Sequence, residues 1–271
     1  MPYAELGDIR LYYEDHGAGE PIVFLHGFTL DHRQWGPQVE YFSKKYRCIV
    51  LDERGHGLSD APATGYDRAT RVEDIRRFAD HLKLDQFHLC GLSRGGVNAI
   101  GYALAHQERL KSLCLVSTGA AGYNASNKFS KLDTIAREQG VEAVKKAWLD
   151  MTMPWLMSRY PKIAELMTQM VNDHSGAIWM DFKRGKYVTP PDLDSVHTIK
   201  VPLLIVAGEH DKMFVPLSRE IHAKVPGSKL VVFPKLGHML TLENPEEFNR
   251  VYGEWLAGQT VSGLDRPAHS Q

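Results

Sequence analysis

One serine lies within a frame of glycines in the segment "GLSRGG" (residues 91–96). The segment follows an apolar run that predicts a buried strand, and it precedes small residues that predict a helix. A G-x-S-x-G pattern at such a junction is typical of a nucleophile elbow, in which Ser93 sits on a strained backbone with its hydroxyl projecting outward. Strand and helix pass close together two residues to either side, so Gly91 and Gly95 must be small. A glycine-rich turn without chemistry is the alternative for this pattern alone.

A serine hydroxyl is a poor nucleophile unless a neighbouring base takes its proton, so the elbow needs partners. Asp211 follows the apolar run "LLIVAG", and His238 lies in a loop after the run "LVVFP". The carboxyl ends of parallel strands meet at one edge of a sheet, so both side chains can reach Ser93 if these runs are parallel strands. Glu209 and His210, which directly precede Asp211, are the nearest rivals for the acid and the base.

Short apolar runs alternate with longer amphipathic stretches along most of the chain. Strands this apolar are buried on both faces, which predicts an α/β fold with a doubly wound, mostly parallel sheet of about eight strands and helices on both faces. Two runs of alternating polarity, near 3–6 and 9–14, predict an antiparallel edge. The expected parallel strands are 21–27, 47–53, 87–93, 111–118, 202–208 and 229–234, and the expected helices are 33–45, 71–83, 95–107, 216–225 and 244–257.

Residues 119–199 interrupt the alternation and predict several short helices, which we interpret as an inserted helical lid. The core is then residues 1–118 and 200–258, and residues 259–271 are expected to be a disordered tail. The lid holds six of the nine methionines and three of the five tryptophans, which either join its helices to each other or line an adaptable apolar pocket. The pocket candidates are Trp148, Met151, Trp155, Met157, Trp179 and Met180.

Composition excludes several classes of partner and cofactor. The 32 basic and 33 acidic residues leave a net charge of -1, which gives no basic field for nucleic acid. The N-terminus has no signal-peptide core and no run of 18 apolar residues occurs, so we expect a soluble, cytoplasmic protein without a membrane partner. Cys48, Cys90 and Cys114 lie in expected strands and predict buried, reduced thiols. No metal motif or dinucleotide fingerprint is present, and no cofactor is expected.

Four motifs follow one another at the ends of the expected strands: "FLHGF" (24–28), "LDERGHGLSD" (51–60), "GLSRGG", and the pair "GEHD" (208–211) and "GH" (237–238). By these motifs residues 1–258 resemble an α/β-hydrolase-fold serine hydrolase, and in particular the small-lid carboxylesterases and enol-lactonases. The order of the serine, the acid and the histidine along the chain is also that of the family's triad.

The resemblance implies roles for individual residues. Ser93, Asp211 and His238 would form the catalytic triad, with Asp211 favoured over Glu209 by its distance from the preceding glycine. The segment "VSTGAAG" (116–122), where some relatives carry the acid, has no carboxylate. The backbone N–H groups of Phe28 and Arg94 would form the oxyanion hole.

The resulting expectation is a hydrolase of small carboxylic esters or lactones with an apolar part, acting through an acyl-enzyme. A carbon–carbon bond hydrolase or a perhydrolase with the same triad is one alternative, and a ligand-sensing protein of this fold is another. The Arg94 side chain either turns away to the surface or to a buried carboxylate, or it reaches an acidic group of the substrate. His26 and His56 are expected to shape their loops through backbone hydrogen bonds, and the sequence does not indicate an oligomeric state.

Overall fold

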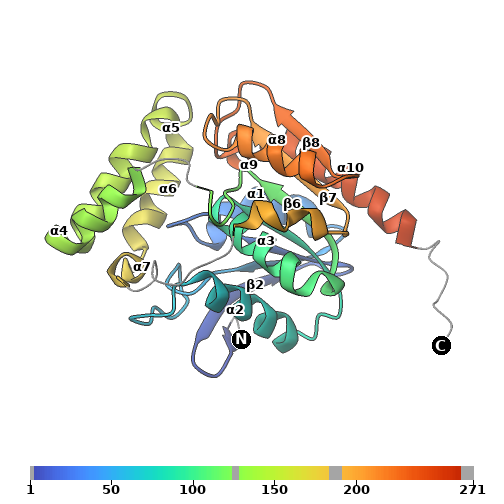
Figure 1. Ribbon diagram of the computed structural model, residues 1–271, viewed down its shortest axis with the longest axis horizontal. Helices are drawn as coiled ribbons and strands as arrows, with labels where there is room; N and C mark the ends of the chain where they lie inside the picture. The colour runs from blue at the N-terminus through green and yellow to red at the C-terminus, as the bar shows by residue number, and fades with distance from the viewer. Residues whose placement is uncertain (1–2, 124–127, 183–190, 264–271) are drawn as a thin grey trace.

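The computed structural model describes residues 3–123, 128–182 and 191–263, and its centre is one eight-stranded sheet (Figure 1). The strand order is β1-β2-β4-β3-β5-β6-β7-β8, with β1, β2 and β4 antiparallel and the remaining neighbours parallel. This confirms the expected mostly parallel sheet and its antiparallel edge. The strands are β1 (Tyr3–Glu5), β2 (Arg10–His16), β3 (Pro21–Leu25), β4 (Arg47–Leu51), β5 (Phe87–Leu92), β6 (Leu110–Val116), β7 (Leu203–Gly208) and β8 (Lys229–Phe233).

Helices cover both faces of the sheet, as expected for a doubly wound fold. Buried side chains of α2, α3 and α8 pack on one face, and those of α1 and α10 pack on the other. In the described ranges no helix is both long enough and apolar enough to cross a bilayer. The helices of the core are α1 (Gly36–Phe42), α2 (Arg68–His81), α3 (Arg94–His106), α8 (Val215–Lys224), α9 (Leu240–Glu243) and α10 (Pro245–Gly263).

The central strands bury both faces because successive side chains point to opposite sides of the sheet. In β3, Val23 and Leu25 face the layer of α2, α3 and α8, whereas Ile22 and Phe24 face the layer of α1 and α10. The three cysteines are all free and buried on the side of α1 and α10, as their sequence context predicted.

Among the described residues between β6 and β7, four α-helices gather beside the sheet (Figure 1). Parts of the segment 119–199, namely 124–127 and 183–190, lie outside the described residues. That this segment is a lid, and that the core divides from it at the expected residues, stay predictions. The inserted helices are α4 (Lys128–Thr152), α5 (Pro154–Arg159), α6 (Pro161–Asp173) and α7 (Ala177–Met180).

The C-terminal helix is longer than expected. Helix α10 continues to Gly263, beyond the expected end at residue 257, and disorder of the tail from residue 259 stays a prediction. A helix already anchored by its first turns can extend at little cost, because each added residue gains one backbone hydrogen bond. Residues 264–271 lie outside the described residues.

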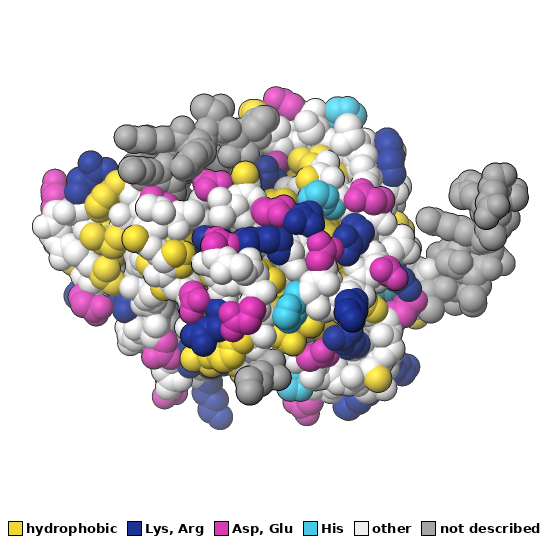
Figure 2. All heavy atoms as spheres, turned by 90° about the horizontal axis from the view of Figure 1, so that it is seen from below, with side chains coloured by type: hydrophobic (Ala, Val, Ile, Leu, Met, Phe, Trp, Pro, Cys, Tyr) yellow, Lys and Arg dark blue, Asp and Glu magenta, His cyan; other side chains and the backbone are white. Residues whose placement is uncertain are grey.

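The outer surface carries mixed charge. On the face drawn in Figure 2, Lys and Arg side chains are interspersed with Asp and Glu. Such a face lacks the continuous basic stripe that typically binds a phosphate backbone.

A buried ion pair fixes the loop between β4 and α2. The Arg54 guanidinium donates two hydrogen bonds to Asp74, from Nε at 2.5 Å and from Nη2 at 2.9 Å. Both side chains are almost fully buried, and Arg77 donates a further hydrogen bond to Asp74 at 2.7 Å. The pair therefore ties the loop that follows β4 to the first half of α2.

We predict that Asp74→Asn lowers the free energy of unfolding by about 3 kcal/mol or more, because it leaves the buried Arg54 charge without its main partner. Urea denaturation measures this change. Asp80→Asn, on the exposed face of the same helix, is the matched control and should cost less than about 1 kcal/mol. Equal effects of the two substitutions would contradict a stabilising role for the buried Arg54–Asp74 ion pair.

Candidate functional site

Ser93 occupies the sharp turn between β5 and α3. Its backbone has φ 55° and ψ -113°, a conformation that a residue with a side chain rarely adopts. A Cβ on Gly91 would come within 2.6 Å of the Gly95 carbonyl carbon, and a Cβ on Gly95 would come within 2.6 Å of the His26 carbonyl oxygen. Both positions therefore require glycine, for the reason that the sequence pattern suggested.

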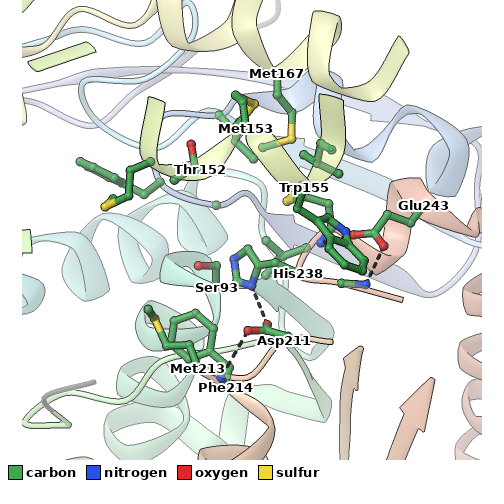
Figure 3. Close-up of a pocket in the computed structure, with 18 of the residues that line it drawn as sticks. Ser93, Thr152, Met153, Trp155, Met167, Asp211, Met213, Phe214, His238 and Glu243 are labelled. Carbon is green, nitrogen blue, oxygen red and sulfur yellow. Dashed lines mark hydrogen bonds and ion pairs between the residues drawn. The ribbon is translucent and has the colours of Figure 1, made fainter. Parts of the chain in front are cut away.

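His238 and Asp211 lie beside this turn, on the loops that follow β8 and β7. His238 Nδ1 is 2.7 Å from Asp211 Oδ2, and Asp211 also accepts a hydrogen bond from the Phe214 N–H at 3.3 Å. Figure 3 shows Ser93 next to the imidazole of His238, with Asp211 on the opposite side of the ring. The three side chains line one cavity.

The two rivals for the acid and the base contact other groups, although His210 also lines the cavity at Ser93. Glu209 accepts a hydrogen bond from the Lys235 N–H at 2.9 Å and does not contact His238 through any hydrogen bond of the described residues. The ring of His210 packs against Trp155 with the centroids 5.0 Å apart. Asp211 is therefore the carboxylate that faces the imidazole.

The surroundings of His238 favour its protonated form. Burial opposes the charged imidazolium, but the charge and hydrogen bond of Asp211, together with the Glu243 carboxylate, outweigh it and raise the pKa of His238 above its ordinary value. Glu243 also accepts hydrogen bonds from the N–H groups of Gly237 at 2.6 Å and Met239 at 2.9 Å. It thus holds the backbone on both sides of His238.

The loop after β3, which carries Phe28, is held by His26. Nε2 of His26 accepts a hydrogen bond from the Glu53 N–H at 3.0 Å, so its Nδ1 carries the proton and donates to the Gly27 carbonyl at 2.8 Å. The Gly27 N–H in turn donates to Gln34 at 2.8 Å. These bonds fix the backbone at Phe28, as expected for a loop-shaping histidine.

The Arg94 side chain turns toward a buried carboxylate. Its Nη2 lies 3.0 Å from His56 Nε2 and 3.6 Å from Glu53 Oε2, and its guanidinium sits over the Phe28 ring at 4.9 Å. His56 donates through Nδ1 to the Arg54 carbonyl at 2.9 Å. Burial, with the charge of Arg94, keeps the pKa of His56 well below its ordinary value, so this ring is a neutral acceptor for Arg94.

The cavity at Ser93 has a volume of about 330 Å³ and a largely apolar wall. Of the six predicted pocket residues, Trp148, Met151 and Trp155 line it. Trp179 is buried and lines a second cavity, described below. Met157 and Met180 line neither this cavity nor the second one, and their side chains are 66% and 39% exposed.

Helical spacing accounts for one part of the cavity wall. Trp148 and Met151 are three residues apart in α4, which places them on one side of that helix, and Trp155 follows in the first turn of α5. Met157, two residues beyond Trp155 in α5, is largely exposed, whereas Met153, two residues before Trp155, lines the cavity. The number of methionines in a segment does not indicate which way each side chain points. The prediction also missed other lining residues, namely Thr152, Met153, Met167, Met213, Phe214 and Glu243.

One group of side chains has the composition of a metal site. Asp31, His32 and Asp52 can each bring one ligand atom within 4.8 Å of the others. Asp52 accepts hydrogen bonds from the N–H groups of His32 at 2.6 Å and Leu58 at 2.9 Å. Asp31 accepts hydrogen bonds from the Arg33 guanidinium. The acids thus already stabilise the loops after β3 and β4, and we assign them that structural role.

A strained serine at the carboxyl edge of a mostly parallel sheet, with a histidine–carboxylate pair beside it, defines a class of enzyme, the hydrolases of the α/β type. The chain belongs to the α/β hydrolase fold family, whose model matches residues 20–245.

Individual relatives cover nearly the whole chain. A Bacillus subtilis protein provisionally named 2-succinyl-6-hydroxy-2,4-cyclohexadiene-1-carboxylate synthase is 30% identical over 92% of this chain and 95% of its own. An esterase from Thermogutta terrifontis, solved with malate bound, has a TM-score of 0.83 and 27% identity over 93% of this chain and 94% of that chain. The enol-lactonase from Burkholderia xenovorans LB400 has a TM-score of 0.82 and 25% identity over 94% of this chain and 100% of that chain.

We predict that Gly95→Ala lowers the free energy of unfolding by about 1–3 kcal/mol, because the added methyl group must push apart the backbones of α3 and of the loop after β3. Chemical denaturation measures the loss. Gly258→Ala in α10, where an added Cβ meets nothing within 4 Å, is the matched control and should be neutral or stabilising. A neutral Gly95→Ala would show that the elbow is not sterically constrained.

Proposed function

We propose that the protein hydrolyses carboxylic esters or lactones, with Ser93 as nucleophile, His238 as general base and Asp211 as the carboxylate that orients the base. The observation that carries the proposal is the meeting of the strained Ser93 with the His238–Asp211 pair at one cavity. A serine hydroxyl needs such a base to become nucleophilic at neutral pH.

The reaction begins when Ser93 Oγ attacks the substrate carbonyl carbon and gives its proton to His238 Nε2. Asp211 stabilises the imidazolium that forms. The backbone N–H groups of Phe28 and Arg94 receive the negative charge on the carbonyl oxygen, aided by the N-terminus of α3. The carbon–oxygen bond of the ester then breaks, and His238 returns the proton to the leaving alkoxide.

The second half of the reaction regenerates the enzyme. His238 takes a proton from water, whose oxygen attacks the carbonyl carbon of the acyl-enzyme. The bond to Ser93 Oγ breaks, Ser93 regains its proton from His238, and the carboxylic acid leaves. No cofactor enters either half.

The first cavity suits an apolar part of the substrate, since tryptophan and methionine side chains form much of its wall. We infer that the inserted helices act as a lid, because α4 and α5 supply Trp148 and Trp155 to that wall. The likeness to an esterase and to an enol-lactonase supports ester and lactone chemistry.

A carbon–carbon bond hydrolase that acts on an acid-bearing ketone is the second candidate. It is favoured by the arginine side chains that line a cavity on the other side of Ser93. Incubation with a dienoic ketoacid separates it from an esterase, because only the carbon–carbon hydrolase would release a shorter dienoic acid.

Replacing Ser93 by alanine should lower kcat on 4-nitrophenyl butanoate by about 10⁴-fold or more, since the covalent route is lost. Steady-state kinetics of purified protein measures the loss, with melting temperature as a check on folding. Ser59→Ala, at a buried serine of the loop after β4, is a control for the loss of a hydroxyl group. Full activity of Ser93→Ala would end the proposal.

The pH dependence follows from the raised pKa of His238. A base must be neutral, so kcat/KM should fall on the acid side with a midpoint above the ordinary histidine value of about 6.5. Asp211→Asn removes the charge that raises this pKa, so the midpoint should move to lower pH while kcat falls by about 10⁴-fold. Glu209→Gln is the control and should leave the profile in place. An acid limb that does not move in Asp211→Asn would contradict the pairing.

A further inference from the structure

A second cavity, of about 550 Å³, also reaches Ser93. Phe28, Ser93, Trp148 and Phe214 line both cavities, so the two meet at the serine. Their walls differ in chemistry. The first is mostly apolar, whereas the second carries the side chains of three arginines, Arg68, Arg71 and Arg94.

The charge of Arg68 is balanced within the protein. Its Nη2 lies 2.6 Å from Asp192 Oδ1, and both side chains are largely buried. The same guanidinium donates to the Val97 carbonyl through Nε at 3.3 Å and Nη2 at 3.2 Å. Arg68 is thus a structural residue of the cavity wall.

Arg71 has no comparable carboxylate partner. Its Nε donates to Asn98 Oδ1 at 3.2 Å and its Nη1 donates to the Tyr66 carbonyl, both of which are neutral acceptors. No ion pair joins Arg71 to a carboxylate in the part of the chain that the structure describes. Burial and the nearby charge of Arg94 lower the pKa of Arg71 to about 9, as expected for a cation held without a close counterion.

Arg71 and Arg94 share one buried carboxylate, Glu53. One oxygen of Glu53 accepts a hydrogen bond from the Asn98 amide, and the other lies 3.6 Å from Arg94 Nη2, beyond normal hydrogen-bond length. The His56 ring beside Arg94 is neutral. Glu53 and Asp67 both act on Arg71 through their charge, but neither forms an ion pair with it among the described residues.

Two further carboxylates line the second cavity and limit where an anion can lie. Asp67 caps α2 by accepting from the Thr70 N–H at 3.0 Å and the Thr70 hydroxyl at 2.7 Å. Asp133 lies on α4. An anion beside either acid would be repelled, so the favourable position is between Arg71 and Arg94, on the Ser93 side of the cavity.

We propose that the second cavity binds a carboxylate of the substrate itself, held by Arg71 and Arg94 while the reacting carbonyl lies at Ser93. This rests on the ester or lactone hydrolysis proposed above and narrows it to substrates with one anionic and one apolar arm. A planar guanidinium matches a carboxylate in shape, and burial strengthens the interaction.

The test compares esters that differ in one charge. The first pair is 4-nitrophenyl hydrogen glutarate and its methyl ester, with the charge on the acyl part. The second is the butanoyl ester of 4-hydroxybenzoate and that of methyl 4-hydroxybenzoate, with the charge on the alcohol part. For at least one pair, kcat/KM of the wild type should be about 10- to 100-fold higher for the charged member, chiefly through KM.

Arg71→Gln should bring that ratio close to one, and Arg71→Lys should keep part of it. Arg76→Gln, on the same helix but paired with Glu73 and Asp80 at the surface, removes the same charge and should leave the ratio unchanged. A wild type without preference in both pairs, or a preference that survives Arg71→Gln, overturns the proposal.

A binding measurement separates this proposal from the catalytic one. Glutarate should raise the melting temperature of Ser93→Ala, glutaramide should not, and the glutarate effect should vanish when Arg71→Gln is added. If no ester is hydrolysed but glutarate still binds through Arg71, only the proposed function fails. If esters are hydrolysed and glutarate has no effect, the carboxylate site fails.

Discussion

The close approach of three backbone segments at Ser93 is the constraint on which the site depends. Strand β5, helix α3 and the loop after β3 meet where Gly91 and Gly95 leave no room for a Cβ. This contact forces the left-handed backbone of Ser93, and the same contact places the N-terminus of α3 beside the loop that carries Phe28. A nucleophile and two backbone donors can therefore be positioned by packing alone, before any side chain selects a substrate.

The histidine depends on a second set of restraints, formed by side chains. His238 lies on a loop that would be free to move, but Glu243 binds the backbone on both sides of it and Asp211 binds its ring. The same two carboxylates raise the pKa of the ring, so its position and its basicity have one origin. Holding a base by charged groups couples its geometry to its proton affinity, which packing by apolar side chains would not do.

The sequence predicted the features that local pattern controls, since strand alternation and glycine spacing are both short-range. The sequence-based prediction failed for residues whose role depends on the direction in which the side chain points. Met157 lies two residues from Trp155, which turns it about 200° around a helix and into solvent. Arg71 was missed for a related reason. A charged residue on an amphipathic helix usually faces water, and only the packing of α2 against α3 brings Arg71 beside Asn98 and near Arg94.

Two cavities that meet at Ser93, only one of which is lined by arginines, could orient a substrate by exclusion as well as by attraction. A carboxylate placed against Trp155 and Met167 would lose its hydration without gaining a partner, whereas an alkyl chain beside Arg71 would bury a cation that has no carboxylate ion partner within the described chain. A substrate bound the wrong way round, with its carboxylate in the first cavity and its alkyl chain in the second, would thus lose binding energy in both cavities. Since both penalties come from burial, they depend on the inserted helices: α4 lines both cavities, α5 and α6 line the first, and α7 lines the second. Under the proposed function, substrate specificity would therefore depend on the inserted helices.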